Sequence, residues 1–188
     1  KVHGKRYVGG AFGSSTGAIS DITNLADVSV DNGDGCNCYA GGIAGSAGGG
    51  DATHLINKGN VSSISKNCYD GNLTKEVGGI FGTGGGKISQ AHNYGNVEGS
   101  ANVGGISGRY GNTSIKDSSN HGKLNGGYWT GGIVGIYQTS GSTEFENLLN
   151  EGELHAGSSL GGIIGKAYFN GAKSKLTFKQ VQNKGDVL

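Results

Sequence analysis

Apolar residues occur along this chain in short alternating runs, each bounded by glycine, asparagine or serine. In each unit an apolar residue precedes the phrase Gly-Gly-Ile-x-Gly, and a second phrase, Asn-x-Gly-x-Val/Leu, follows further on. The runs are too short for helices, and their boundary residues favour strands. We therefore expect one strand at the Gly-Gly phrase, a second that ends at the asparagine, and a third around the last Val or Leu.

The two phrases occur six times. The Gly-Gly phrase starts at Gly9, Gly41, Gly78, Gly104, Gly131 and Gly161. The asparagine phrase starts at Asn24, Asn57, Asn93, Asn120, Asn150 and Asn183. A unit of three short strands cannot bury its apolar side chains alone and must stack on its neighbours. The chain is thus expected to be an all-β, right-handed parallel β-solenoid (β-helix) of six stacked coils, the hand following the usual rule for parallel crossovers.

The repeats also predict the domain organisation. Residues 1–188 are expected to form a single β-solenoid repeat domain, with coils starting near residues 7, 39, 76, 102, 129 and 159. No capping segment, methionine or signal peptide is visible in the sequence. Because a solenoid needs caps on its open edges, we expect a fragment of a longer array, with further repeats or flanking domains in the same chain.

The column of six asparagines has a structural explanation. Asparagine tolerates the left-handed conformation of a sharp corner, and stacked identical amides can form a hydrogen-bonded ladder along the axis. The glycines two residues later are expected to have a positive φ at the same corner, namely Gly59, Gly95, Gly122, Gly152 and Gly185. We expect the asparagines to be structural rather than catalytic.

The first strand allows two interpretations, because apolar residues such as Val77 and Ile80 fall on both of its faces. In one, a single face lines the core, and the other, flanked by rows of glycine, receives another layer or a partner. In the other, the strand is kinked and both residues turn inward. The sequence leaves both open.

Composition excludes several classes of partner. The net charge is +1 with histidine neutral, and the charged residues are scattered, so no basic stripe for nucleic acid is present. No apolar run approaches the roughly 20 residues that span a bilayer. We therefore expect no nucleic-acid partner and no membrane span.

The sequence shows no catalytic constellation. The five histidines have no His-Glu-x-x-His spacing and are expected to be isolated solvated or capping residues: His3, His54, His92, His121 and His155. No Gly-x-Ser-x-Gly elbow accompanies a set of acid and base residues. Carboxylates are scattered rather than clustered as in polysaccharide-active enzymes. We expect no catalytic residue, no metal and no cofactor.

Length variation and aromatic residues indicate candidate binding positions. Insertions in solenoids form loops that often bind ligands, and here they fall in two pairs. The pairs are Val30–Tyr39 with Ser62–Glu76 on the first coils, and Tyr137–Thr143 with Ala167–Leu176 on the last. Candidate binding residues are the loop acids Asp31 and Asp34, the loop residue Tyr69, and the aromatics before the Gly-Gly phrase, Tyr7, Tyr39 and Trp129. The aromatics either pack on the edge of the rod or form a platform for sugar rings or a protein.

The loops also contain cysteines and the corners contain charges. The triplet Asn-Cys-Tyr occurs twice, around Cys38 and Cys68, so in an oxidising compartment Cys68 is expected to pair with Cys38 or with Cys36. At the corners, oppositely charged residues of neighbouring coils are expected to form ion pairs, Lys123 with Glu153 and Glu151 with Lys184.

Phrases such as Val77-Gly78-Gly79-Ile80-Phe81-Gly82 with Asn93-Tyr94-Gly95-Asn96-Val97 resemble the GLUG repeat, with Ile where Leu is usual. The resemblance covers essentially the whole chain. It implies a bacterial secreted or surface-anchored protein, because GLUG repeats occur in adhesin-like proteins and in zinc metallopeptidases that cleave immunoglobulin A, where they are accessory to a separate catalytic domain.

We therefore expect a non-catalytic extracellular or cell-surface module that acts as an adhesin or ligand-presenting stalk for a host protein or glycan. The alternatives are an accessory repeat region of an immunoglobulin A-cleaving zinc metallopeptidase, a polysaccharide-active β-helix enzyme and a plain spacer.

Overall fold

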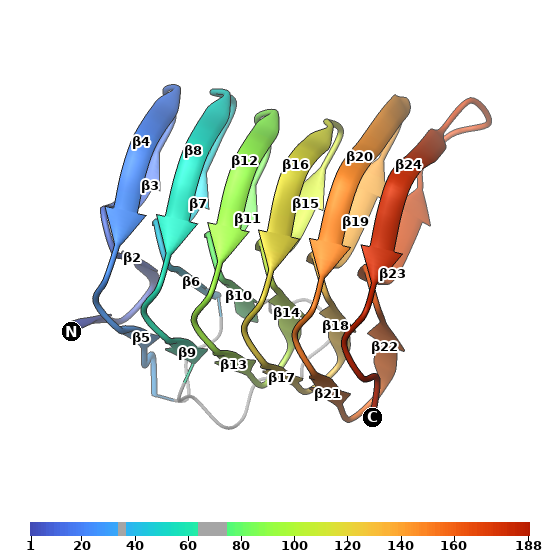
Figure 1. The fold of residues 1–188 in the computed structure, drawn as a ribbon. Helices are drawn as coiled ribbons and strands as arrows, with labels where there is room; N and C mark the ends of the chain where they lie inside the picture. Colours follow the sequence, from blue (N-terminus) through green and yellow to red (C-terminus); the bar gives the residue numbers. More distant parts are fainter. Residues whose placement is uncertain (34–36, 64–74) are drawn as a thin grey trace.

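The computed structural model describes residues 1–33, 37–63 and 75–188. These residues form strands and no helix, so none of them belongs to a helix that could cross a membrane. The strands build four parallel six-stranded sheets that stack as six coils along one axis (Figure 1). The predicted all-β parallel solenoid is confirmed.

Each coil contributes one strand to each sheet. Sheet A contains β1 (Val2–Gly4), β5 (Val28–Val30), β9 (Val61–Ser63), β13 (Val97–Gly99), β17 (Leu124–Gly126) and β21 (Leu154–Ala156). Sheet B contains β2 (Tyr7–Gly9), β6 (Cys38–Gly41), β10 (Lys75–Gly78), β14 (Asn102–Gly104), β18 (Trp129–Gly131) and β22 (Ser159–Gly161). Sheet C contains β3 (Phe12–Ser15), β7 (Ala44–Ala47), β11 (Phe81–Gly84), β15 (Ser107–Gly111), β19 (Val134–Thr139) and β23 (Ile164–Phe169). Sheet D contains β4 (Ile19–Asn24), β8 (Ala52–Asn57), β12 (Ile88–Asn93), β16 (Ile115–Asn120), β20 (Ser142–Asn150) and β24 (Lys175–Asn183).

The path of the chain defines the hand of the coil. In Figure 1 the chain runs down the front in sheet D, crosses below through sheets A and B, and rises at the back in sheet C. It advances from the N-terminal to the C-terminal end as it does so. This coil is right-handed, as the crossover rule predicts.

The Gly-Gly phrase breaks the expected first strand into two, so each coil has four strands rather than three. Val77, before the break, packs in a core between sheets A and B, and Ile80, after it, packs in a second core between sheets C and D. Both side chains have 0% exposure. Of the two interpretations left open by the sequence, the kinked strand is the one observed.

The Gly-Gly phrase and the asparagine phrase of each coil lie against one another between the two cores, where the coil is narrow; we call this region the waist. A Cβ on Gly79 would stand 2.3 Å from Cγ of Asn93 and 2.2 Å from the carbonyl oxygen of Gly105. Real Cβ atoms do not approach other atoms so closely, so the second glycine of the phrase makes room for the buried asparagine. The second glycine of the Gly-Gly phrase and the asparagine recur together, because only glycine leaves space for the asparagine side chain.

The asparagines form the predicted amide ladder. The Nδ2 atom of Asn57 donates to Oδ1 of Asn93 at 2.9 Å, and that of Asn93 donates to Oδ1 of Asn120 at 2.8 Å. The ladder continues from Asn24 to Asn183 across all six coils. Each Nδ2 also donates to the carbonyl two residues later, for example from Asn93 to Gly95 at 2.8 Å. Because both hydrogens of each inner amide are used, the buried polar column is satisfied.

The predicted corner conformations are wrong for both residue types. The left-handed residues are three positions before the asparagines, with φ between 48° and 59°: Asp21, His54, Gln90, Asp117, Asn147 and Gln180. The asparagines themselves are not left-handed, because their side chains must point inward to the ladder. Nor do the corner glycines have a positive φ. A Cβ on Gly95 would instead stand 1.9 Å from the Gly59 carbonyl oxygen of the preceding coil, so close stacking is what requires glycine.

The insertions do not all form loops. Most of Tyr137–Thr143 and part of Ala167–Leu176 extend the strands of sheets C and D, and β20 and β24 have nine residues each where β16 has six. The last two coils are therefore taller than the others. The first pair of insertions contains residues 34–36 and 64–74, which lie outside the described residues.

Candidate functional site on the re-entrant face

Two rows of outward side chains flank the Gly-Gly kink. Because Val77 and its equivalents point into the core, the residues before them point outward. This row on sheet B is in register from coil to coil: Tyr7, Tyr39, Glu76, Asn102, Trp129 and Ser159. The corresponding row on sheet C is Ser14, Ser46, Thr83, Arg109, Ile136 and Lys166.

The two sheets fold toward one another on the outside of the rod. A Cβ on Gly82, between the two rows, would stand 2.9 Å from the Ala40 nitrogen and 3.0 Å from the Glu76 carbonyl oxygen. An outward Cβ meets backbone only where the surface is concave. We call the two rows and this glycine floor the re-entrant face.

One ion pair crosses the re-entrant face. The Arg109 Nη1 atom lies 3.4 Å from Oε1 of Glu76, and its Nη2 donates to Oε1 of Gln138 at 3.1 Å. The Glu76 side chain is 1% exposed and that of Arg109 is 41% exposed. Burial raises the pKa of Glu76 to about 7, and the nearby guanidinium of Arg109 opposes that rise.

A polar atom without a partner lies beside this ion pair. Asn102 stacks on Glu76 in sheet B, and its residue is 2% exposed. Its Oδ1 atom is buried without a hydrogen-bond donor among the described residues. An unpaired buried acceptor costs about 1–3 kcal/mol and requires an explanation.

A shallow pocket of about 300 Å³ opens on the sheet C side. It is lined by Thr83, Gly84, Arg109, Tyr110, Gly111, Asn112 and Gln138. The hydroxyl of Thr83, the guanidinium of Arg109 and the amide of Gln138 supply both hydrogen-bond donors and acceptors. The pocket therefore offers both donors and acceptors to a polar group.

The predicted aromatic candidates lie on the same face. The rings of Tyr7 and Tyr39 stack with centroids 4.9 Å apart and planes at 5°, and Arg6 lies 5.7 Å from the Tyr7 ring. Trp129 meets Tyr168 of the next coil edge to face at 6.5 Å. The structure thus brings three predicted candidates, Tyr7, Tyr39 and Trp129, into one row, with Glu76 and Asn102 between them.

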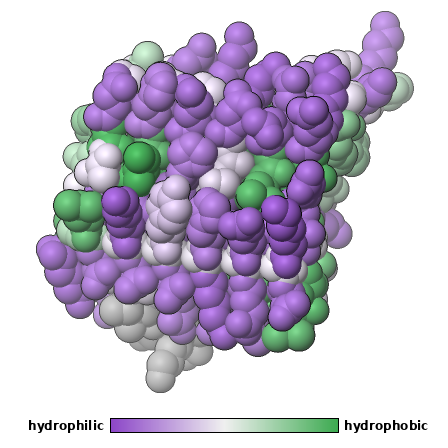
Figure 2. Space-filling view, viewed as in Figure 1, coloured by the Kyte–Doolittle hydropathy of each residue, from purple (hydrophilic) through white to green (hydrophobic). Residues whose placement is uncertain are grey.

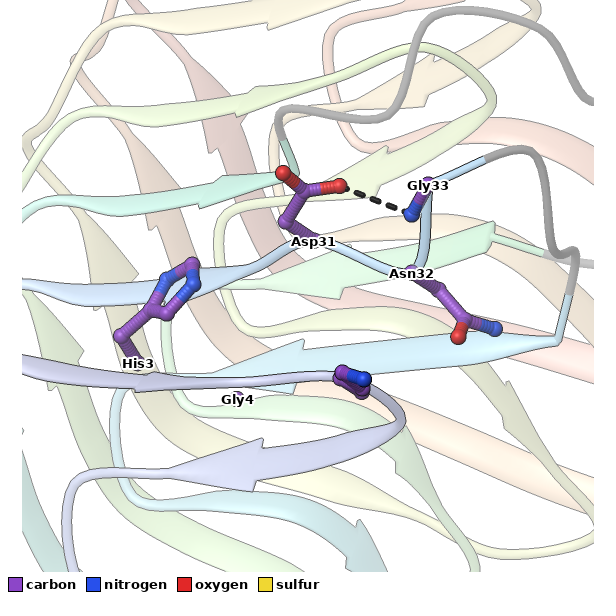
Figure 3. A pocket seen from close by; sticks show the side chains of 6 residues that line it. His3, Gly4, Asp31, Asn32 and Gly33 are labelled. Carbon is purple, nitrogen blue, oxygen red and sulfur yellow. Dashed lines mark hydrogen bonds between the residues drawn. The ribbon is translucent and has the colours of Figure 1, made fainter.

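The acidic loop candidate lies elsewhere. Asp31 lines a pocket of about 540 Å³ with His3, Lys5 and Asn32 at the N-terminal coil (Figure 3). Its Oδ1 accepts from the backbone nitrogen of Gly33 at 2.9 Å, so the carboxylate caps its own loop. Within residues 1–33, 37–63 and 75–188 no three His, Cys, Asp or Glu are grouped to hold a metal ion. The predicted candidates Asp34 and Tyr69 lie outside these ranges.

Cys38 is a buried free thiol, and its Sγ atom lies 3.8 Å from Oγ of Ser63. Burial raises the pKa of this thiol, while the hydrogen bond from Ser63 opposes the rise. The predicted pairing of Cys68 with Cys38 is therefore not formed in this structure. Cys36 and Cys68 are outside the described residues, so the alternative pairing of Cys68 with Cys36 stays a prediction.

The corner residues correct one expectation and confirm another. His92 and His121 are not isolated, because both are hydrogen-bonded to Ser119. The charge pairs form as predicted, with Lys123 Nζ 3.0 Å from Glu153 and Lys184 Nζ 3.6 Å from Glu151.

Comparison of the chain with protein-family models, with curated proteins and with solved structures gave no match. Glu76, Asn102, Arg109 and Gln138 are not among the binding residues that the sequence pattern predicts. Glu76 and Asn102 could have been found from their place in the repeat, because residues at equivalent positions of successive coils lie on one surface.

Proposed function

We propose that this protein is a non-catalytic binding module that holds an extended polysaccharide along the re-entrant face. The observation that carries the proposal is the in-register row of aromatic and amide side chains on sheet B, facing the polar pocket of sheet C across a glycine floor.

A polysaccharide suits this face for three reasons. An aromatic ring such as that of Trp129 buries the apolar face of a sugar ring. The hydroxyl of Thr83, the guanidinium of Arg109 and the amide of Gln138 line the pocket and pair with sugar hydroxyls. The rows also continue from coil to coil at about 4.8 Å per step, so they form a linear surface for a linear ligand.

Binding explains the face better than hydrolysis does. Glycoside hydrolysis uses two carboxyl groups about 5–10 Å apart. Glu76 is the only acid in the two rows, and it is paired with Arg109. We therefore keep a polysaccharide-active enzyme only as the second candidate function, after the binding module.

The cellular setting follows from the resemblance to GLUG repeats. We propose an extracellular or cell-surface location in a bacterium, where the rigid rod acts as an adhesin or stalk that presents the re-entrant face to a host or environmental glycan. A second setting, as an accessory region of an immunoglobulin A-cleaving metallopeptidase, rests on the same resemblance alone. A zinc peptidase domain in the same gene would favour it.

The experiment is a glycan array with the purified 188-residue chain and three variants. Arg109→Ala and Trp129→Ala change the re-entrant face. Tyr94→Ala is the matched control, because this tyrosine is 50% exposed at the corner between sheets D and A. We expect one class of polysaccharide to bind the wild type and the control, and affinity to fall at least about tenfold, or 1.4 kcal/mol, in the two face variants. Equal affinity of all four proteins, or capture of a host protein alone, would overturn the proposal.

A further inference from the structure

A second constellation lies away from the re-entrant face, where strand β16 ends. Asn120 turns inward to the amide ladder, so the alternation of the strand directs Ser119 and His121 outward. The equivalent corner of the next coil places Glu151 beside His121. This corner borders the face of sheet D that Figure 2 shows, which is largely hydrophilic.

The three side chains form a continuous relay. The Oγ atom of Ser119 lies 2.8 Å from Nε2 of His121, and Nδ1 of His121 lies 2.9 Å from Oε2 of Glu151. A serine, a histidine and a carboxylate joined through the two different ring nitrogens are the arrangement that activates serine nucleophiles.

The hydrogen bonds determine where the protons lie. A carboxylate only accepts hydrogen bonds, so Nδ1 of His121 carries a proton, and in the neutral ring Nε2 is then the acceptor. The hydroxyl of Ser119 therefore donates to Nε2. His92, whose Nδ1 lies 2.8 Å from the same Oγ atom, donates to Ser119 from the other side. Burial lowers the pKa of His92, and the charge that His121 carries when protonated lowers it further.

Neighbouring groups hold the relay in place. The ring of Tyr94 stacks on that of His121 with centroids 4.7 Å apart and planes at 6°. Lys184 lies 3.6 Å from the other oxygen of Glu151. Histidine and carboxylate are thus positioned before any reagent arrives, which is the main requirement for general-base assistance.

We propose that Ser119 is a nucleophilic serine that accepts an acyl group from activated carboxylic esters or thioesters, with His121 as its base and Glu151 as the residue that orients His121. This goes beyond the binding role proposed above and does not depend on it.

The acyl transfer takes place in two steps. The Ser119 Oγ atom forms a bond to the acyl carbon, and its proton passes to Nε2 of His121. The bond from that carbon to the leaving oxygen or sulfur then breaks, and the proton of Nε2 passes to the leaving alcohol or thiol. Glu151 stays ionised and stabilises the imidazolium that forms between the two steps. Rapid turnover requires oxyanion donors in addition, so we infer one acylation per chain rather than sustained hydrolysis.

The chain contains its own control. Ser29 lies 2.8 Å from Nδ1 of His3, in the same way that Ser119 lies beside histidine, and both serines are largely buried, at 3% and 7% exposure. In the described part of the chain, no carboxylate is hydrogen-bonded to His3. A serine beside a histidine is thus present twice, once with the carboxylate and once without.

The test treats the folded chain with p-nitrophenyl acetate and maps acetylated peptides by mass spectrometry while nitrophenolate release is followed. We expect a burst of about one equivalent, with acetyl on Ser119 and not on Ser29. Ser119→Ala should abolish the burst and Ser29→Ala should leave it intact. His121→Asn and Glu151→Gln should slow it at least about tenfold, since general bases contribute about 10²- to 10⁴-fold. Circular dichroism would show that all variants fold.

Two results would overturn the proposal. One is acetylation of Ser119 and Ser29 at equal rates, which would make the relay a purely structural network. The other is an unchanged burst in folded Ser119→Ala, which would place the nucleophile elsewhere.

Discussion

Asn93 donates to the side chain of Asn120 in the next coil at 2.8 Å and to the carbonyl of Gly95 in its own coil at 2.8 Å. Both asparagines have 0% exposure. One amide thus closes its own corner and fixes the register of the next coil, and the same pair of bonds recurs along the rod.

Breaking the middle of the ladder should be costly. Asn93→Ala leaves the Nδ2 of Asn57 without its ladder acceptor and the Oδ1 of Asn120 without its donor. At about 1–3 kcal/mol for each of these two buried unpaired groups, we expect the free energy of unfolding to fall by roughly 2–6 kcal/mol, measured by urea denaturation.

The matched control is the same change at the exposed end of the ladder. Asn183→Ala should cost about 1 kcal/mol, because water reaches this position. Equal losses for the two variants would show that the ladder adds nothing beyond local capping.

The waist glycines should tolerate no side chain. In Gly79→Ala the new Cβ would stand 2.2 Å from the Gly105 carbonyl oxygen, so backbone in two coils must move. We expect a loss above about 4 kcal/mol or failure to fold, in the range reserved for severe core changes. Gly17→Ala, where nothing lies within 4 Å, should change stability by at most about 0.5 kcal/mol. Thermal unfolding of the two variants distinguishes them, and similar midpoints would contradict the waist described here.

Glu76 should make stability depend on pH. Its pKa is raised from 4.5 to about 7 in the folded chain, so the folded state holds a proton that the unfolded state has lost between these values. The contribution is therefore fully present below pH 4.5 and is lost as the pH rises through about 7. The shift corresponds to roughly 3 kcal/mol.

Glu76→Gln isolates this contribution from that of other titrating groups. The variant keeps the shape of the side chain and cannot ionise. We expect the difference in unfolding free energy between variant and wild type to increase from pH 4.5 to pH 7.5, in favour of the variant. A difference that stays constant over this interval would mean that folding does not raise the pKa of Glu76.

Much of the fold could be predicted from the sequence because a solenoid repeats its constraints. The spacing of Asn93 and Asn120 gave the ladder and its register, and the charge pair between Lys123 and Glu153 followed from the same alignment. Every coil supplied an independent copy of the same evidence, which is why the number of coils and the parallel stacking were predicted correctly.

The division into two cores could not be predicted in the same way. Val77 and Ile80 are separated by two glycines, and the sequence pattern is equally consistent with a flat strand and a sharp kink. The position of the left-handed residue was missed because polar residues such as Gln90 suit both an exposed strand and a left-handed turn.

The two groups of interacting surface residues form only where residues from different sheets or different coils lie on one face of the rod. Arg109 and Glu76 belong to different sheets, and Ser119 and Glu151 belong to different coils. Once the inward position of Asn120 is known, the outward position of its two neighbours follows from alternation. The contact between sheets B and C, in contrast, depends on the kink and is visible only in three dimensions.

The most direct test of the binding role uses the single tryptophan of the chain, Trp129, which lies on the re-entrant face. Its fluorescence would be titrated with the polysaccharide selected on the array, for the wild type and for Arg109→Ala. The account predicts a saturable change in emission and reduced quenching by acrylamide in the wild type, with at least about tenfold weaker binding in the variant. Tight binding of the polysaccharide with unaltered Trp129 emission in both proteins would contradict it, because the ligand would then occupy another surface.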